Sequence, residues 1–416
     1  KTLFISLLAA LALSAAGCGN ENNDPIDQQG PETPEVTEPG NTMVIYEANP
    51  KVFASSKSLK AIEERLDEIQ DLGVNVVWLM PIQQQGSKNS VGSPYCIKDF
   101  KAVNPSYGTL DDLKSLVKKA HSMEMKVILD WIANHTSWDN PWITEHPDWY
   151  TKDANGNIIS PAGMGWNDVA DLNFNSKELR ANMIDAMTYW VKEADVDGFR
   201  CDYADGVPMD FWKDALDAVK AVKADAILLA EGSEMKLLDS GFQMLYGWDF
   251  QSKLASVFSG RMDVSRLYET HKNEYKDFAK GKHRLRFTTN HDKAMSDGSP
   301  ITIYKGERGA MAAFVITAYM GGIPLIYSSQ EVGYSKTINF FTNHFAKRSF
   351  NFNVFKREIS GDFVSHQHGY FVKQLLKLAG GSVLVSHDRQ LVCNKGVVND
   401  MQYAHLYSPL LYISNI

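Results

Sequence analysis

Acidic side chains stand at the ends of short apolar runs, where they could act together on one substrate. Asp202, Glu231 and Asp292 each close such a run, with Arg200 two residues before Asp202 and His291 beside Asp292. Unpaired carboxylates are very rarely buried for structural reasons, because desolvating them costs more than folding recovers. Two carboxyl groups in different environments can divide nucleophilic from acid–base work. These residues therefore predict a catalytic site.

The elements that must position these side chains are short apolar runs alternating with amphipathic segments. Helical segments are expected at Leu59–Leu72, Leu110–Met123, Lys177–Glu193, Asp210–Val222 and Gly309–Tyr319. The strand-like runs are Met43–Ala48, Val74–Met80, Lys126–Ala133, Val196–Cys201, Ala226–Ala230, Phe242–Leu245, Leu285–Thr289 and Ile323–Tyr327. Parallel neighbours need crossover helices, so the pattern predicts an α/β fold, a (β/α)₈ TIM barrel over residues 43–340. Catalytic groups gather at the C-terminal ends of barrel strands, which brings the three carboxylates to one rim.

The segments at these strand ends resemble the four signature regions of the α-amylase family, glycoside hydrolase family 13. They are Asp130-Trp-Ile-Ala-Asn134-His135, Gly198-Phe-Arg200-Cys-Asp202, Leu228-Leu-Ala-Glu231 and Thr288-Thr-Asn290-His291-Asp292, in the family's order. Two further segments agree, Asp168-Val-Ala-Asp171-Leu-Asn173 and Gly322-Ile-Pro324-Leu-Ile-Tyr327 with Glu331. The resemblance covers about Met43 to Phe341, and it implies an inserted subdomain at 136–172 after the third strand.

The resemblance implies a role for each matching residue. Asp202 would be the nucleophile, Glu231 the general acid/base and Asp292 a third carboxylate that binds sugar hydroxyls. Arg200 would keep Asp202 ionised, whereas like charges and desolvation would raise the pKa of Glu231. The expected substrate-binding residues are Tyr95, Asp130, His135, Arg200, Asn290 and His291. The alternative for Asp130 and Asn134 is that they support the site without touching substrate.

The stretch after Asp202 departs from the family. Many members carry Lys-His there, whereas this chain continues Tyr203-Ala-Asp205-Gly-Val-Pro208. Asn134 resembles a family calcium ligand, and Asp139 and Asp168 are available acids, but a calcium cage needs six or more oxygen ligands. We expect the chemistry itself to need no cofactor.

Composition excludes several classes of function. Lys and Arg number 42 against 50 Asp and Glu, for a net charge of −8, so there is no basic field to hold nucleic acid. The 4 cysteines have no zinc-ligand spacing. The tryptophans of the inserted subdomain could form a glucan-binding wall, but we expect most to pack inward, with Trp166 exposed.

The N-terminal segment is typical of a signal for export. Residues 1–18 resemble a signal peptide with a bacterial lipobox, Ser14-Ala-Ala-Gly-Cys18, in which Cys18 is lipidated. Residues 19–42 are rich in acids and proline, without Lys or Arg, as in a flexible linker. The expected protein is an exported lipoprotein on the periplasmic face or the cell surface, in contact with a bacterial membrane only through its lipid.

The last segment, 341–416, differs in composition from the segments predicted to form the barrel. It contains 8 Lys and Arg against 4 Asp and Glu, and no recognisable β-sandwich sequence. We interpret it as an atypical, incomplete or out-of-frame tail; the alternative is a divergent C-terminal domain.

The whole pattern predicts retaining, endo-type hydrolysis of α-1,4-glucosidic bonds in starch, glycogen or maltooligosaccharides. α-Glucosidase, neopullulanase or cyclomaltodextrinase-like and transglycosylating activities use the same motifs, so fold alone does not choose among them. From another class, the chain could be an inactive surface glucan-binding lipoprotein.

The lipobox yields a direct test. Mass spectrometry of the mature protein should find Cys18 as an acylated N-terminal residue, and cell fractionation should place the protein with membranes. An unmodified N-terminus at another position would contradict the lipobox interpretation.

Overall fold

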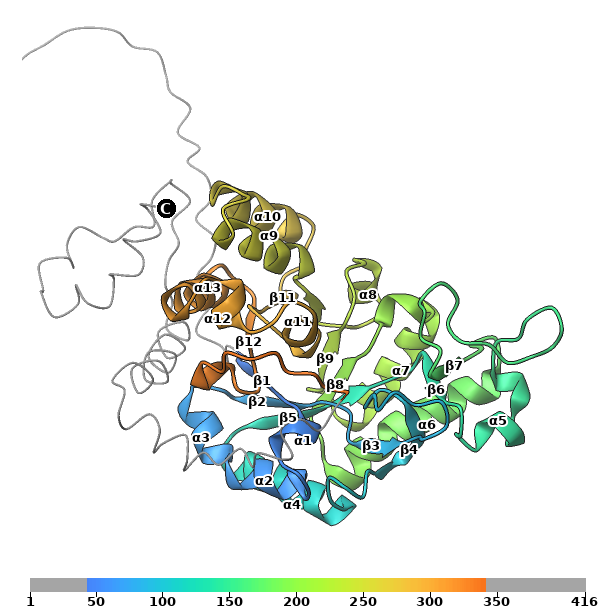
Figure 1. Cartoon of the computed structure of the whole chain (residues 1–416). Coiled ribbons are helices and arrows are strands. Elements are labelled where there is room, and N and C mark those ends of the chain that lie inside the picture. The colour runs from blue at the N-terminus through green and yellow to red at the C-terminus, as the bar shows by residue number, and fades with distance from the viewer. Residues whose placement is uncertain (1–42, 342–416) are drawn as a thin grey trace, which may run out of the picture. The chain divides into compact units, whose positions relative to one another are not determined.

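The predicted barrel is confirmed. The computed structural model describes residues 43–341, in which eight parallel strands close into a barrel in the order β1-β12-β11-β10-β9-β8-β5-β2. Their bounds are β1 (Ile45–Ala48), β2 (Val76–Leu79), β5 (Lys126–Trp131), β8 (Gly198–Cys201), β9 (Ile227–Ala230), β10 (Met244–Tyr246), β11 (His283–Arg286) and β12 (Ile323–Tyr327). Figure 1 shows these strands at the centre of the described chain, surrounded by helices.

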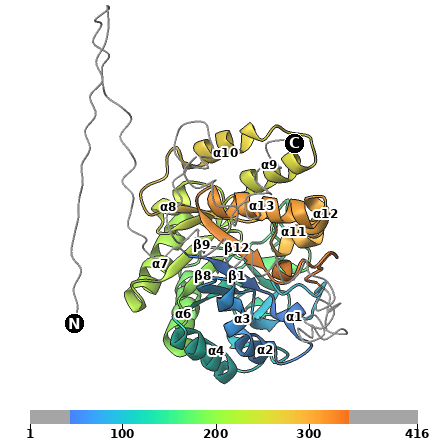
Figure 2. The same cartoon turned by 90° about the vertical axis from the view of Figure 1, so that its left-hand side faces the viewer.

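Helices cover the outside of the barrel. The longer ones are α2 (Ser58–Glu64), α3 (Leu66–Asp71), α4 (Leu110–Ser122), α6 (Lys177–Ala194), α7 (Met209–Val222), α9 (Trp248–Phe258), α10 (Ser265–Tyr275), α11 (His291–Ser296) and α13 (Glu307–Tyr319). Short turns of helix are α1 (Pro50–Phe53), α5 (Trp142–Glu145), α8 (Lys236–Asp239), α12 (Pro300–Ile303), η1 (Pro147–Trp149), η2 (Ala204–Gly206) and η3 (Gln330–Val332). Figure 2 shows α2, α3, α4 and α6 on one side of the strands and α9 to α13 on the other.

Local sequence explains where these helices begin. The Thr109 hydroxyl caps α4 by accepting a hydrogen bond from the Asp112 amide, and the Asp112 carboxylate accepts one from the Thr109 amide. This reciprocal capping box satisfies two amides that a helix leaves free. Ser176 caps α6 by a single bond, in which its hydroxyl accepts from the Leu179 amide.

Strand alternation selects which side chains face the barrel interior. An apolar cluster that includes Ile45, Ile128 and Leu229 fills that interior. Side chains two residues apart on a strand point the same way, so Asp130 and Glu231 continue the inward-facing rows at the C-terminal ends of their strands. The fold therefore aims the acidic residues over a packed apolar core.

Some boundaries differ from the sequence predictions. The seventh strand was expected at Leu285–Thr289, but β11 starts at His283, which pairs with Met244 of β10. The strand ends before Thr289, and Asn290 caps the helix α11 that follows. The expected helix Leu59–Leu72 is interrupted at Arg65, whose φ of −110° and ψ of 6° are not helical.

Among the helices that were not predicted, α9 and α10 are the longest, with 11 residues each. In α10 only Leu267 and Thr270 are buried, so its sequence lacks a wide apolar stripe. The helix is instead tied to the barrel by Glu274, which pairs with the buried Arg286 of β11.

Two small antiparallel sheets extend the loops at the C-terminal rim. One pairs β3 (Gln83–Gln85) with β4 (Ile97–Val103), and the other pairs β6 (His135–Ser137) with β7 (Val169–Asp171). Among the tryptophans between β6 and β7, Trp149 is buried, whereas Trp138, Trp142 and Trp166 are half-buried. Trp166 was expected to be exposed, but it packs against His135 and Tyr203.

The described chain ends beyond β12. There the Tyr46 hydroxyl of β1 donates to Glu331 Oε1 at 2.9 Å, which ties η3 to the strand that closes the barrel. The signal and linker at 1–42 and nearly all of the tail at 341–416 lie outside the described residues. Between 43 and 341, no helix is long and apolar enough to cross a membrane.

A buried carboxylate anchors the strands that carry the site. Asp197 directly precedes β8 and is 1% exposed. It accepts hydrogen bonds from the Val127 amide at 2.8 Å and from His121 Nε2 at 2.7 Å, and Lys223 Nζ lies 2.9 Å away. Burial opposes its charge, but these contacts outweigh burial and lower the pKa of Asp197. The cluster ties β8 to β5 at the end opposite the catalytic rim.

We predict that Asp197→Asn lowers the free energy of unfolding by about 2 kcal/mol at pH 7, because the buried ion pairs lose their anion. Denaturant unfolding measures the difference. A folded-state pKa below the ordinary value stabilises the protein above that value, so the difference should shrink as acid protonates Asp197. Asp225→Asn is the matched control, since Asp225 pairs with Lys126 of the same cluster but is 69% exposed. Equal effects of the two substitutions would contradict this account.

Candidate active site

Three carboxylates converge on one guanidinium. Arg200 Nη1 donates to Asp130 Oδ1 at 2.8 Å and to Asp202 Oδ1 at 2.7 Å. Arg200 Nη2 lies 2.9 Å from Glu231 Oε2, at an angle outside hydrogen-bonding geometry. Asp202 and Glu231 are thus held side by side on a single cation, at the ends of β8 and β9.

Arg200 itself is fully buried. Its Nε donates to the Tyr246 hydroxyl at 3.1 Å, and its guanidinium carbon lies 5.0 Å from the ring centre of Trp78 and 5.8 Å from that of Tyr95. A planar cation with several donors suits this aromatic surrounding better than an ammonium would. Arg200 is 0% exposed and holds Asp130, Asp202 and Glu231 together, and its contact with substrate stays a prediction.

The two carboxylates differ in environment. Glu231 Oε2 accepts a hydrogen bond from the Tyr203 amide at 2.9 Å. Burial raises the pKa of Glu231, Arg200 opposes the rise, and the nearby Asp202 and Asp292 add to it, for a value of about 8. Glu231 is therefore protonated at neutral pH. Asp202, at 8% exposed, accepts from Arg200 and stands at the mouth of the barrel.

Asp130 supports the site from below. Its Oδ2 accepts from the Trp78 indole at 3.3 Å and from the Tyr95 hydroxyl at 3.2 Å, while Oδ1 accepts from Arg200. Burial raises its pKa to about 7, against the effect of Arg200. Asp130 is 0% exposed and both of its oxygens accept hydrogen bonds, which favours the alternative that it supports the site. Its contact with substrate stays a prediction.

A second charged cluster lies on the opposite wall. His291 Nδ1 lies 2.5 Å from Glu47 Oε1, and Nε2 lies 3.3 Å from Asp292 Oδ1 and 2.7 Å from the Tyr95 hydroxyl. Burial would lower the pKa of His291, but Asp292 and Glu47 outweigh burial and raise it to about 9. The imidazole is therefore a cation at neutral pH.

The remaining predicted residues fall around these two clusters. Asn290 is 0% exposed, accepts from the Lys293 amide and donates to Asp292 at 3.4 Å, so it orients that carboxylate, and its contact with substrate stays a prediction. The Tyr95 ring stacks on His291 with centres 5.4 Å apart. His135 is buried beside Trp166, and burial lowers its pKa.

The residues offered for calcium do not form a cage. Asn134 Nδ2 lies 3.3 Å from His135 Nδ1, and Asp139 accepts from the Ser87 amide and pairs with Lys98 at 3.4 Å. Within residues 43–341, no three His, Cys, Asp or Glu side chains are grouped to hold a metal ion. Calcium binding at Asn134 stays a prediction, and we derive no step through the ion.

Several functional neighbours were missed from sequence, namely Glu47, Trp78, Tyr203 and Tyr246. A signal existed for Glu47, because an acid inside the apolar run Met43–Ala48 is unusual and its parity matches the inward-facing Ile45. The others carry no local sign of their contacts, which come from separate strands.

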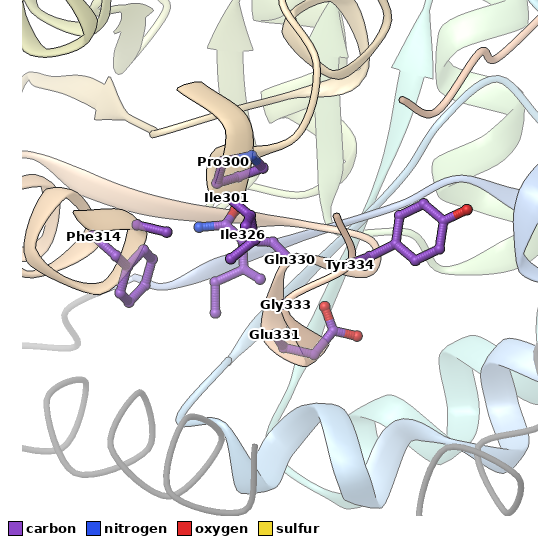
Figure 3. Close-up of a pocket in the computed structure, with 9 residues that line it drawn as sticks. Pro300, Ile301, Phe314, Ile326, Gln330, Glu331, Gly333 and Tyr334 are labelled. Atoms are coloured by element: carbon purple, nitrogen blue, oxygen red, sulfur yellow. The ribbon is translucent and has the colours of Figure 1, made fainter. Parts of the chain in front are cut away.

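A pocket outside the barrel is separate from this site. Figure 3 shows it between α12, α13, β12 and η3, with Ile301, Phe314 and Ile326 among its apolar lining and Glu331 at its edge. None of its lining residues belongs to either charged cluster.

Comparison with known proteins identifies the family. The α-amylase catalytic-domain model matches residues 45–158 and 163–367, more than half of the chain. This chain belongs to the α-amylase family. Every carboxylate of the two clusters falls within the matched residues.

Among relatives of this α-amylase-family chain, "Alpha-amylase 3" of Dictyoglomus thermophilum is 26% identical over 335 residues, which cover 70% of this chain and 64% of that protein. A cyclomaltodextrinase of Thermoanaerobacter pseudethanolicus is 26% identical over 298 residues, covering 66% and 50%. The crystal structure of the maltogenic α-amylase AmyB from Thermotoga neapolitana superposes with a TM-score of 0.72 at 27% identity, covering 82% and 77%. The chain thus spans 64% and 50% of the two curated relatives.

We predict that Glu47→Gln lowers the pKa of His291 from about 9, because one of its two carboxylate neighbours loses its charge. A pH titration of the histidine ring signals by NMR measures this, with His291 assigned from a His291→Gln variant. The stabilisation from a raised pKa is present at low pH and lost as the pH rises through about 9, so the variant should lose stability at pH 6 but little above pH 10. Glu307→Gln, an exposed acid at the start of α13, should leave the His291 titration unchanged.

Proposed function

We propose that this protein is a retaining hydrolase of α-1,4-linked glucans such as starch, glycogen and maltooligosaccharides. The observation that carries the proposal is the shared guanidinium of Arg200, which holds Asp202 and Glu231 together while Glu231 is protonated at neutral pH. A retaining glycosidase needs this pair, one carboxylate to attack and one carboxylic acid to protonate the leaving oxygen.

The proposed reaction proceeds in two displacements. Asp202 attacks the anomeric carbon, and the glycosidic bond breaks as Glu231 gives its proton to the leaving oxygen. Water then attacks the glycosyl-enzyme, losing a proton to Glu231 and releasing Asp202. The first step requires protonated Glu231, so kcat/KM should fall as the pH rises through about 8.

The second cluster supplies sugar contacts in this scheme. Asp292 is 39% exposed, in contrast to its buried neighbour His291, so its carboxylate can accept hydrogen bonds from sugar hydroxyls. The buried pair of His291 and Glu47 holds Asp292 in place from behind.

Other activities of the family remain candidates for the finer specificity. One relative is named a cyclomaltodextrinase and one structural neighbour a maltogenic α-amylase, which supports testing cyclic and short substrates beside starch. The alternative from another class, an inactive glucan-binding lipoprotein, would keep starch binding without release of reducing sugar. The complete set of Asp202, Glu231 and Asp292 favours the enzyme.

The proposed location is outside the cytoplasm. The support is the signal-like run before Cys18 and the acidic linker at 19–42.

Stereochemistry tests retention. NMR of the first product released from a maltooligosaccharide should show the α-anomer, because two displacements at one carbon restore its configuration. Initial appearance of the β-anomer would refute the double displacement.

The two carboxylates should respond differently to substitution. Asp202→Asn removes the nucleophile, so turnover should fall by about 10⁴-fold or more on every substrate. Glu231→Gln should impair maltooligosaccharides most, while an activated aryl α-glycoside still forms the covalent intermediate and azide rescues the second step.

Asp249→Asn provides a control for loss of one carboxylate near the rim, since Asp249 lies at the start of α9, pairs with Lys253 and is 59% exposed. Each variant should first match the parent's thermal transition. Equal losses for Asp202→Asn and Glu231→Gln on both substrates, without azide rescue, would contradict the assigned roles.

A further inference from the structure

The residue that follows Asp202 has a main-chain conformation that is rare for its type. Tyr203 has φ 40° and ψ 48°, in the left-handed region that side chains with a Cβ avoid. Strain of this kind persists only where the surroundings hold it, and it gathers at functional sites. Tyr203 lies at the entry to η2, beside the two central carboxylates.

Neighbouring residues pack closely around the Tyr203 ring and hold it in one position. A Cβ on Gly206 would lie 2.1 Å from ring atom Cε1, so only glycine leaves room for the ring. The ring also packs edge-on against Trp166 with centres 5.0 Å apart, and its hydroxyl lies 3.5 Å from Met164 Sδ. Packing of the side chain thus maintains the unusual backbone.

This conformation ties the turn after Asp202 to the segment that carries Glu231. The Tyr203 amide donates to the Glu231 carboxyl at 2.9 Å, and the Ala204 amide donates to the Glu231 main-chain carbonyl at 2.8 Å. Asp205 then accepts from the Ser233 amide at 2.9 Å. Three successive residues therefore bind both sides of the Glu231 segment.

The same contacts determine which oxygen of Glu231 can carry a proton. The Tyr203 amide presents its hydrogen to Oε2 at 2.9 Å, and Arg200 Nη2 lies 2.9 Å from the same oxygen without a hydrogen bond to it. An amide hydrogen and a cation beside Oε2 leave it the role of acceptor. In the neutral carboxyl group the hydrogen must then sit on Oε1.

We propose that Tyr203 is a positioning residue for Glu231: its left-handed main chain keeps an amide hydrogen on Oε2 and thereby holds the transferable proton on Oε1. The inference rests on the proposed acid role of Glu231. It explains why an aromatic residue, locked by its ring, occupies a strained position directly after Asp202.

The test compares Tyr203→Ala with Tyr203→Gly. Both remove the ring, but only glycine adopts the left-handed conformation without strain. In the alanine variant, kcat on a maltooligosaccharide should fall about tenfold with a smaller change in KM, because the acid is misoriented. The basic limb of its pH profile should move to higher pH, since the Tyr203 amide lowers the pKa of Glu231. The glycine variant should recover most of the kcat and keep the limb in place.

A matched pair separates this effect from backbone strain in general. Glu124 has φ 58° and is exposed in the turn before β5, away from the rim. Glu124→Ala and Glu124→Gly should differ in thermal stability without moving the pH profile. Equal losses in the two Tyr203 variants, a change confined to KM, or an unmoved limb in Tyr203→Ala would overturn the inference.

The proposed function is judged separately on the same substrates. Full activity of Glu231→Gln, or an inactive parent chain, would refute the proposed function and the inference with it. Loss of activity in Glu231→Gln with alanine and glycine equivalent at position 203 would refute the inference alone.

Discussion

A buried guanidinium surrounded by carboxylates is the interaction on which the rest of the site depends. Arg200 is fully buried and contacts Asp130, Asp202 and Glu231 from three adjacent strands. Removing one partner of such a group leaves an uncompensated buried charge, which costs about 3–5 kcal/mol. The parallel register that pairs Asp130 with Arg200, and Arg200 with Leu229, must therefore be kept for the site to exist.

The balance of charge in this space explains why the carboxylates behave differently. Arg200 and protonated His291 are the two cations, and they face five acids, Glu47, Asp130, Asp202, Glu231 and Asp292. With an excess of acids and little water, the protein binds protons where desolvation is greatest. Burial accordingly raises the pKa of Glu231 to about 8 and that of Asp130 to about 7. The same chemical group thus has two different proton affinities within one site, as the proposed acid role of Glu231 requires.

Stabilising ion pairs and the acids of the candidate site lie at opposite ends of the barrel. At the N-terminal end of β8, Asp197 pairs with surrounding cations and a main-chain amide, and its pKa is lowered. At the other end the pKa values of buried acids are raised, which opposes folding at neutral pH. The Asp197 ion pairs and the packed interior around Ile45 and Ile128 stabilise the fold. They offset the unfavourable burial of the acids at the C-terminal rim.

The sequence by itself determined the eight strands, their parallel arrangement and the rim where Asp202, Glu231 and Asp292 meet, because alternation, strand ends and crossover helices are local patterns. It did not reveal α9 and α10, and in α10 a buried ion pair to the barrel stands in place of a wide apolar stripe. It did not reveal that Arg200, Asp130 and Asn290 are fully buried, since the burial of a polar side chain depends on distant strands. Only the tertiary structure decided the conformation of Tyr203, because the packing of its ring on Gly206 and Trp166, and not its own backbone preference, selects the left-handed region.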